Sequence, residues 1–91
     1  MEVEQILKEI EKVCKKNNVN KLILFGSFAK STYYDTSDID IAVAGNFNYW
    51  DLIDNLESIE TLRSIDVVDL NDLKNEHVWE DINKYGRILY R

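Results

Sequence analysis

Two aspartates separated by one residue, Asp38 and Asp40, are the residues of this sequence best suited to chemistry. Side chains two positions apart on a β-strand point to the same face, so the two carboxylates would stand side by side. Two such charges about 4 Å apart repel by about 4 kcal/mol at an effective dielectric constant of about 20. Protonation of one acid relieves this repulsion, but a hard divalent cation such as Mg²⁺ does so better, because it prefers carboxylate and phosphate oxygens.

A Gly-Ser pair, Gly26 and Ser27, follows the apolar run 22–25 and comes before these acids. This pattern indicates a buried strand that ends in a tight turn and a short helical turn over residues 28–31. The backbone N–H groups of such a turn can bind a phosphate. Ser27 can also cap the helical turn, and the two roles are compatible. Beside the Asp pair, the turn predicts a site where a metal and a nucleoside triphosphate meet.

A third carboxylate is available from the apolar run 64–70, which contains Asp66 and Asp69. These two acids are three positions apart, so on a regular strand they point to opposite faces. Only one of them can therefore join Asp38 and Asp40. Spacing leaves open which one does so.

The elements that position these groups follow from the hydrophobic pattern. Apolar side chains recur at helical spacing in residues 2–17, 49–62 and 71 or 72 to 85. Apolar runs predict strands at 21–25, 39–44 and 64–70, a polar loop at 31–37, and a short closing strand or apolar tail at 88–90. The fold class is therefore α/β (α+β), a small mixed β-sheet with helices packed on it.

Four aromatic or sulfur-containing side chains could have either a structural or a functional role. Cys14 lies on the apolar stripe of the first helix and is expected to be a small core residue. Trp50 is expected to anchor the second long helix in the core. Tyr33 and Tyr34 in the polar loop could stack on a base or contact a partner, although exposed tyrosines are common in loops. The last helix is expected to bury a stripe that consists of Val78, Trp79, Ile82 and Tyr85.

The chain has 91 residues, which corresponds to one domain over residues 1–91. Its net charge of −6 argues against direct binding of nucleic acid and fits a basic protein partner better. A single cysteine cannot form an internal disulfide, and neither a leader nor an apolar run of transmembrane length occurs. These features predict a cytoplasmic protein without a membrane partner.

Gly26-Ser27, ten further residues and Asp38-Ile39-Asp40 resemble the signature of the polymerase-β-like nucleotidyltransferases. The short chain resembles their smallest branch, the minimal nucleotidyltransferase (MNT) proteins. The resemblance implies that Asp66, early in its strand, is the third acid of the site. It also implies two Mg²⁺ ions held by the three aspartates, with ATP as the donor and its phosphates oriented by Gly26 and Ser27.

The function implied by this resemblance is that of an antitoxin. An MNT antitoxin works with a helical HEPN-family toxin and transfers a nucleoside monophosphate, AMP from ATP, to a hydroxyl group, namely that of a toxin tyrosine. One alternative is a non-catalytic subunit that neutralises its partner by binding alone. Another is a small-molecule nucleotidyltransferase of the antibiotic-modifying kind. A homo-oligomer is compatible with each of these functions.

Overall fold

The fold is a four-stranded mixed sheet with helices on both faces, which confirms the predicted small mixed sheet with helices packed on it and shows that the end of the chain forms a strand. The computed structural model describes residues 2–30, 32, 34 and 37–91. The elements within these residues are α1 (Val3–Lys16), β1 (Val19–Phe25), α2 (Gly26–Ala29), β2 (Ile39–Gly45), α3 (Tyr49–Glu57), β3 (Ile65–Asp69), α4 (Glu76–Tyr85) and β4 (Arg87–Tyr90). The strand order is β3-β2-β1-β4; β1 is antiparallel to both β2 and β4, and β2 is parallel to β3.

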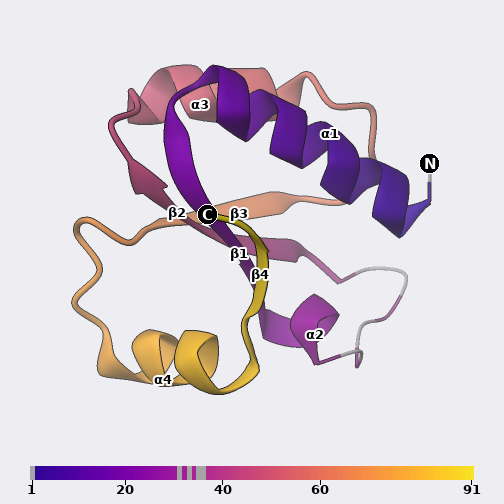
Figure 1. The fold of residues 1–91 in the computed structure, drawn as a ribbon. Helices are drawn as coiled ribbons and strands as arrows, with labels where there is room; N and C mark the ends of the chain where they lie inside the picture. Colours follow the sequence, from indigo (N-terminus) through magenta and orange to yellow (C-terminus); the bar gives the residue numbers. More distant parts are fainter. Residues whose placement is uncertain (1, 31, 33, 35–36) are drawn as a thin grey trace.

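The sheet separates two layers of helices (Figure 1). Helices α1 and α3 cover one face, and α4 covers the other, with α2 at the end of β1. Leu22 and Leu24 of β1 belong to the larger core cluster under α1 and α3. Ile23 and Phe25, which alternate with them, pack with Ile82 of α4. Strand β1 is therefore buried on both faces, as its unbroken apolar run predicts.

Helix α1 presents its apolar stripe to the sheet and ends where the asparagines begin. Cys14 is fully buried, and burial raises the pKa of its thiol to about 12, so this residue belongs to the core as predicted. Asn17 caps the helix, and Asn18 takes the left-handed conformation with φ 65°. Asn adopts this conformation more readily than most residues, which explains why the chain turns here into β1.

Helix α3 is shorter than the predicted 49–62 and ends at Glu57. The expectation that Trp50 is a core anchor is wrong, because its side chain is 72% exposed. Leu52 and Leu56 are four positions apart and face the sheet. Trp50 precedes Leu52 by two positions, and a helix turns about 100° per residue, so its side chain points to the opposite side.

Helix α4 begins at Glu76, several residues later than predicted. The side chain of Asn75 accepts hydrogen bonds from the N–H groups of His77 and Val78 and thereby caps the helix. Ile82 is buried, but Tyr85 is 45% exposed, so the predicted buried stripe is wrong at its last position.

The short helix α2 also departs from its prediction, which placed it at 28–31. It begins at Gly26, with Phe25 as its N-cap, so Ser27 lies inside the helix and is not its cap. Phe28 is buried in the core. Tyr33 lies outside the described residues, whereas Tyr34 is described and is 78% exposed.

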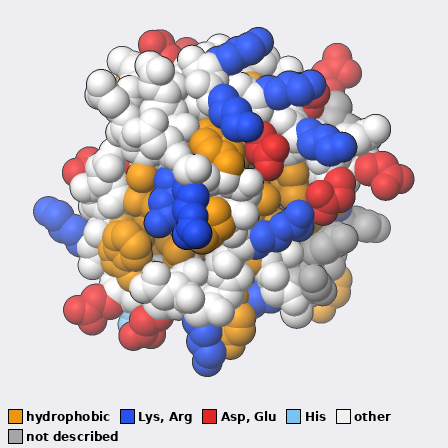
Figure 2. All heavy atoms as spheres, viewed as in Figure 1, with side chains coloured by type: hydrophobic (Ala, Val, Ile, Leu, Met, Phe, Trp, Pro, Cys, Tyr) orange, Lys and Arg blue, Asp and Glu red, His pale blue; other side chains and the backbone are white. Residues whose placement is uncertain are grey.

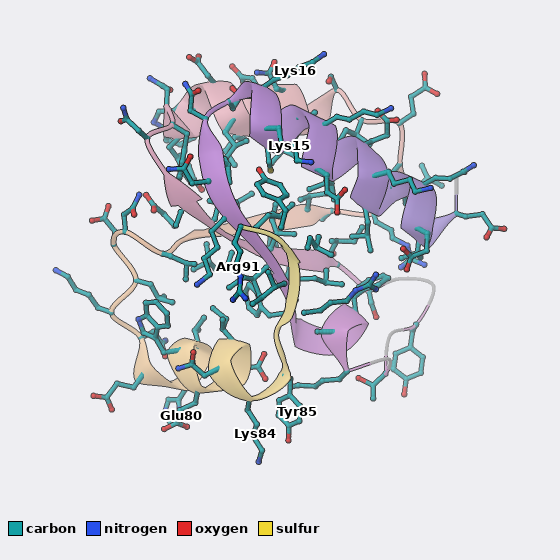
Figure 3. All side chains as sticks on the ribbon, viewed as in Figure 1. Lys15, Lys16, Glu80, Lys84, Tyr85 and Arg91 are labelled. Carbon is teal, nitrogen blue, oxygen red and sulfur yellow. The ribbon has the colours of Figure 1, made fainter. Side chains whose placement is uncertain are left out.

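The surface seen in Figure 2 carries many Lys and Arg side chains among hydrophobic ones, although the chain has a net charge of −6. Lys15 and Lys16 of α1 and Arg91 after β4 contribute to this face (Figure 3). In the part of the chain that the structure describes, no helix has the length and apolar character needed to cross a membrane.

Candidate active site

Asp40 and Asp66 lie opposite each other on the neighbouring parallel strands β2 and β3. Their carboxyl groups are within reach of a side-chain hydrogen bond. Ile39 and Ile41 are fully buried in the core under α1 and α3. Because side chains alternate along a strand, the carboxylate between these two isoleucines points to the other face, toward α4.

Asp38 immediately precedes β2 and is exposed. Partial burial of Asp40, followed by the negative charges of Asp66 and Asp38, raises the pKa of the Asp40 carboxyl to about 6. The charges of Asp66 and Asp38 thus both act on Asp40, and the assignment of the three aspartates to one metal site stays a prediction. Ionisation of the middle one is opposed by the other two.

Asp69 lies further along β3, opposite Val43. Its Oδ1 accepts a hydrogen bond of 2.9 Å from the backbone N–H of Asn71, in the turn that follows the strand. The geometry therefore places Asp66, and not Asp69, beside Asp40. The role of Asp66 as a metal ligand stays a prediction.

Gly26, in the turn after β1, lies close to the carboxylate of Asp40. Its φ of 71° is in the left-handed region, and a Cβ on this residue would collide with Oδ2 of Asp40. The turn therefore approaches the Asp40 carboxylate closely, which requires glycine for two independent reasons. Ser27 follows, partly exposed, and its carbonyl accepts a hydrogen bond of 3.0 Å from the N–H of Thr32.

A fourth carboxylate, Asp81 of α4, also reaches this turn. Its Oδ2 accepts a hydrogen bond of 3.3 Å from the N–H of Gly26, and its Oδ1 lies 2.6 Å from Nζ of Lys30. Its negative charge adds to the effects that raise the pKa of Asp40. Asp81 could not be predicted from the sequence, because it lies 55 positions from Gly26 and an acid on a helix is ordinarily expected to be solvated.

Lys30 brings a positive charge to the end of α2. Its ammonium group pairs with Asp81, and this hydrogen bond raises the pKa of Lys30. The group also lies 4.9 Å from the centre of the Tyr85 ring, at the end of α4 (Figure 3). Lys30 is thus protonated and held near the acids through a carboxylate on a different element.

Arg63 joins the starts of the two strands that carry the acids. Its Nη1 donates hydrogen bonds of 3.0 Å to the carbonyl oxygens of Tyr34 and Ser37. The guanidinium also lies over the ring of buried Phe28, 5.0 Å from its centre. Since Ser37 precedes Asp38 and Arg63 lies just before β3, this side chain fixes the approach to both strands.

The chemistry of these groups fits a hard cation in an open site. Among residues 2–30, 32, 34 and 37–91, no group of three or more His, Cys, Asp or Glu side chains is arranged so that it could hold a metal ion by itself, so substrate or water oxygens would have to supply the other ligands. Mg²⁺ is commonly bound by one or two carboxylates, with water and substrate phosphates completing its shell. The all-oxygen donor set and the negative potential at Asp40 suit such an ion.

A mixed sheet whose adjacent parallel strands carry acids beside a Gly-Ser turn is the arrangement that the resemblance to nucleotidyltransferases leads one to expect. Residues 8–91 match the family described as Polymerase beta, Nucleotidyltransferase, and the chain belongs to this family. It is an enzyme of the nucleotidyltransferase class.

Within this family, one relative and two solved structures are similar to the chain over most of its length. It is 29% identical over 100 residues to MJ0604 of Methanocaldococcus jannaschii, provisionally named a protein adenylyltransferase, and the match spans 99% of this chain and 100% of the relative. A crystal structure of a toxin–antitoxin with AMP-PNP contains a chain that matches with a TM-score of 0.74 and 29% identity, over 91% of this chain and 71% of that one. A mutant of the toxin–antitoxin MntA-HpeT matches with a TM-score of 0.73 and 27% identity, over 91% and 71% of the two chains. These matches confirm the resemblance to an MNT antitoxin.

Proposed function

We propose that this protein is an antitoxin that transfers AMP from ATP to a hydroxyl group of a HEPN-family toxin, most directly the hydroxyl of a toxin tyrosine. The observation that carries this proposal is the position of Asp66 opposite Asp40, beside the Gly26 turn. The choice of ATP and of a toxin partner is supported by the matched complexes, one of which contains AMP-PNP and both of which are toxin–antitoxin pairs.

Asp38, Asp40 and Asp66 would hold Mg²⁺, in two ions as for many phosphoryl-transfer sites. When bound, the metal polarises the phosphate oxygens and lowers the pKa of the attacking hydroxyl. Gly26 and Ser27 would orient the β- and γ-phosphates. The ammonium group of Lys30 would offset negative charge on the leaving pyrophosphate.

In this reaction the acceptor oxygen forms a bond to the α-phosphorus of ATP. The bond from that phosphorus to the oxygen that bridges to the β-phosphate breaks, and pyrophosphate leaves. The hydroxyl proton passes to solvent. The protein contributes mainly by holding the triphosphate and the acceptor in line and by arranging charge in advance, which are the large terms in phosphoryl transfer.

The test uses purified protein, Mg²⁺ and each of the four ribonucleoside triphosphates in turn, together with the protein encoded by the neighbouring gene. Intact-mass spectrometry of that neighbour should show a gain of one or more AMP units with ATP alone. The double variant D38N/D40N is the matched inactive control, since Asn keeps the size of Asp and removes its charge.

Two alternatives predict other outcomes when the activity of the toxin is also assayed and an aminoglycoside is offered as a second acceptor. A non-catalytic subunit would give no mass gain, and D38N/D40N would neutralise the toxin as well as the wild type does. A small-molecule nucleotidyltransferase would leave the neighbour unmodified and would add a nucleotide to an aminoglycoside. The expected setting for the proposed reaction is the cytoplasm, with residues 1–91 acting as one domain.

A further inference from the structure

The carboxylate of Asp81 occupies a position between two hydrogen-bond donors, one at the first residue of α2 and one on the residue that follows this helix. One of its oxygens accepts from the N–H of Gly26 at 3.3 Å, and the other lies 2.6 Å from Nζ of Lys30. Its side chain is only 24% exposed. The contacts come from an element that lies 55 positions away, so the fold itself places this acid here.

This pair of contacts is the kind that a phosphate group makes. A backbone N–H and an ammonium group both donate to an anionic oxygen, and two oxygens of one anion are engaged at once. In the proposed function, the same N–H and the same ammonium group face the phosphates of ATP. The nucleotide and Asp81 would therefore compete for the same donors.

Asp81 also adds charge to a site that already contains three aspartates. Its negative charge acts on Asp40, which lies against Gly26. A polyanionic substrate that enters this site meets the repulsion of Asp81 for as long as the carboxylate stays in place.

We propose that Asp81 sets the affinity for the triphosphate: its carboxylate occupies the N–H of Gly26 and the ammonium group of Lys30 in the nucleotide-free protein, and the phosphates displace it. Asp81 is a positioning residue in this account, because it holds the Gly26 turn and Lys30 before the nucleotide arrives. The inference rests on the proposed function, since it takes ATP as the ligand.

The test compares wild type and D81N for binding of ATP and of AMP in the presence of Mg²⁺, by calorimetry at low ionic strength. Asn keeps an acceptor for the N–H of Gly26 but gives up the charge. We expect D81N to bind ATP about threefold to fivefold more tightly, which is the upper end of the range measured for ion pairs near a protein surface. Binding of AMP, which lacks the β- and γ-phosphates, should change less than twofold, and the gain for ATP should shrink at high salt.

Two further variants separate this role from a structural one. D69N makes the same chemical change at the end of β3, about 10 Å along the strand from Asp66 at 3.3 Å per residue, and should leave the affinity for ATP unchanged. D81E restores the carboxylate and should return the affinity toward that of the wild type. Equal gains for ATP and AMP, or a gain in D69N as large as in D81N, would reduce the effect to net charge and overturn the proposal.

Weaker binding of ATP by D81N would also overturn it, since Asp81 would then support the nucleotide instead of competing with it. The outcome is separable from that of the proposed function. If D81N binds ATP more tightly but no protein accepts AMP, the inference holds and the transfer reaction does not. If neither the wild type nor D81N binds ATP, both proposals are wrong.

Discussion

The Cα of Gly26 lies against the carboxylate of Asp40, with no space between them for a Cβ. Gly26 follows β1 and begins α2. Asp40 belongs to β2, which is antiparallel to β1, and it pairs there with Phe25, the last residue of β1. This contact ties the turn proposed to bind phosphate to the acid proposed to bind metal. Its consequences can be measured separately from activity.

Replacement of Gly26 by Ala should destabilise the protein and abolish transfer. The positive φ alone costs about 1–2 kcal/mol for an L-residue, and the collision with Asp40 adds to this. A double-mutant cycle with D40A isolates the collision, because D40A removes the carboxylate that the new Cβ would meet. Urea denaturation should show that G26A costs less in the D40A background, and an equal cost in both backgrounds would contradict the contact.

The raised pKa of Asp40 predicts how stability changes with pH in the absence of metal. The ordinary value is 3.8 and the folded value is about 6, so the folded state favours the protonated acid. The stability that this group contributes is fully present below about pH 3.8 and is lost as the pH rises through about 6. The wild type should therefore lose stability relative to D40N between pH 4 and pH 7.5.

Mg²⁺ should reverse this loss, because a cation favours the ionised acid. Melting temperatures of the wild type with EDTA and with Mg²⁺ should differ at pH 7.5 and converge near pH 4. D40N should show a smaller response to Mg²⁺ at both pH values. A response in D40N as large as that of the wild type would place the ion elsewhere.

Arg63 should matter more for activity than for stability. Its two hydrogen bonds hold the carbonyl groups of Tyr34 and Ser37, just before Asp38. R63M should lower the rate of transfer about tenfold, the scale on which residues that orient metal ligands act. R87M is the matched control: it breaks the exposed ion pair of Arg87 with Glu4, at 3.4 Å, and should leave the rate unchanged. Equal effects of the two variants would remove the special role of Arg63.

Trp50 and Leu52 provide a paired test of the packing of α3. W50A should change the free energy of unfolding by less than about 0.5 kcal/mol, because the side chain is 72% exposed. L52A should cost about 2–5 kcal/mol, because Leu52 is fully buried. Chemical denaturation of both variants measures the difference. A large loss of unfolding free energy in W50A would show that Trp50 packs in the core after all.

Strands and the first helix could be predicted from the sequence because each carries a strong local signal. The unbroken apolar run of β1 indicates a strand buried on both faces, and Asn18 indicates the turn before it. Trp50 was assigned wrongly because a large hydrophobic side chain was taken to face the core, whereas its position two residues before buried Leu52 turns it to the opposite side of the helix. The start of α4 was misplaced because Asn75, and not Asn71 or Asp72, supplies the cap.

The features of the candidate site that depend on residues close in sequence could be predicted. Those that depend on contacts between distant residues could not. The charge of Asp38 acts on Asp40, two positions along the chain, and this spacing can be read from the sequence. The choice between Asp66 and Asp69 depends on the register of β3 against β2, which spacing does not specify. The approach of Asp81 to Gly26 depends on how α4 packs on the sheet, and no pattern near either residue encodes it.

The most direct test of the central claim compares D66N with D69N for Mg²⁺-dependent transfer of AMP to the toxin, followed by intact mass. Both variants remove one carboxylate from β3, but only Asp66 lies opposite Asp40. We expect D66N to reduce transfer by about 100-fold or more, the scale on which loss of a single preorganised group acts, and D69N to keep it. Full activity in D66N, or loss of activity in D69N alone, would show that Asp66 is not the third acid of the site.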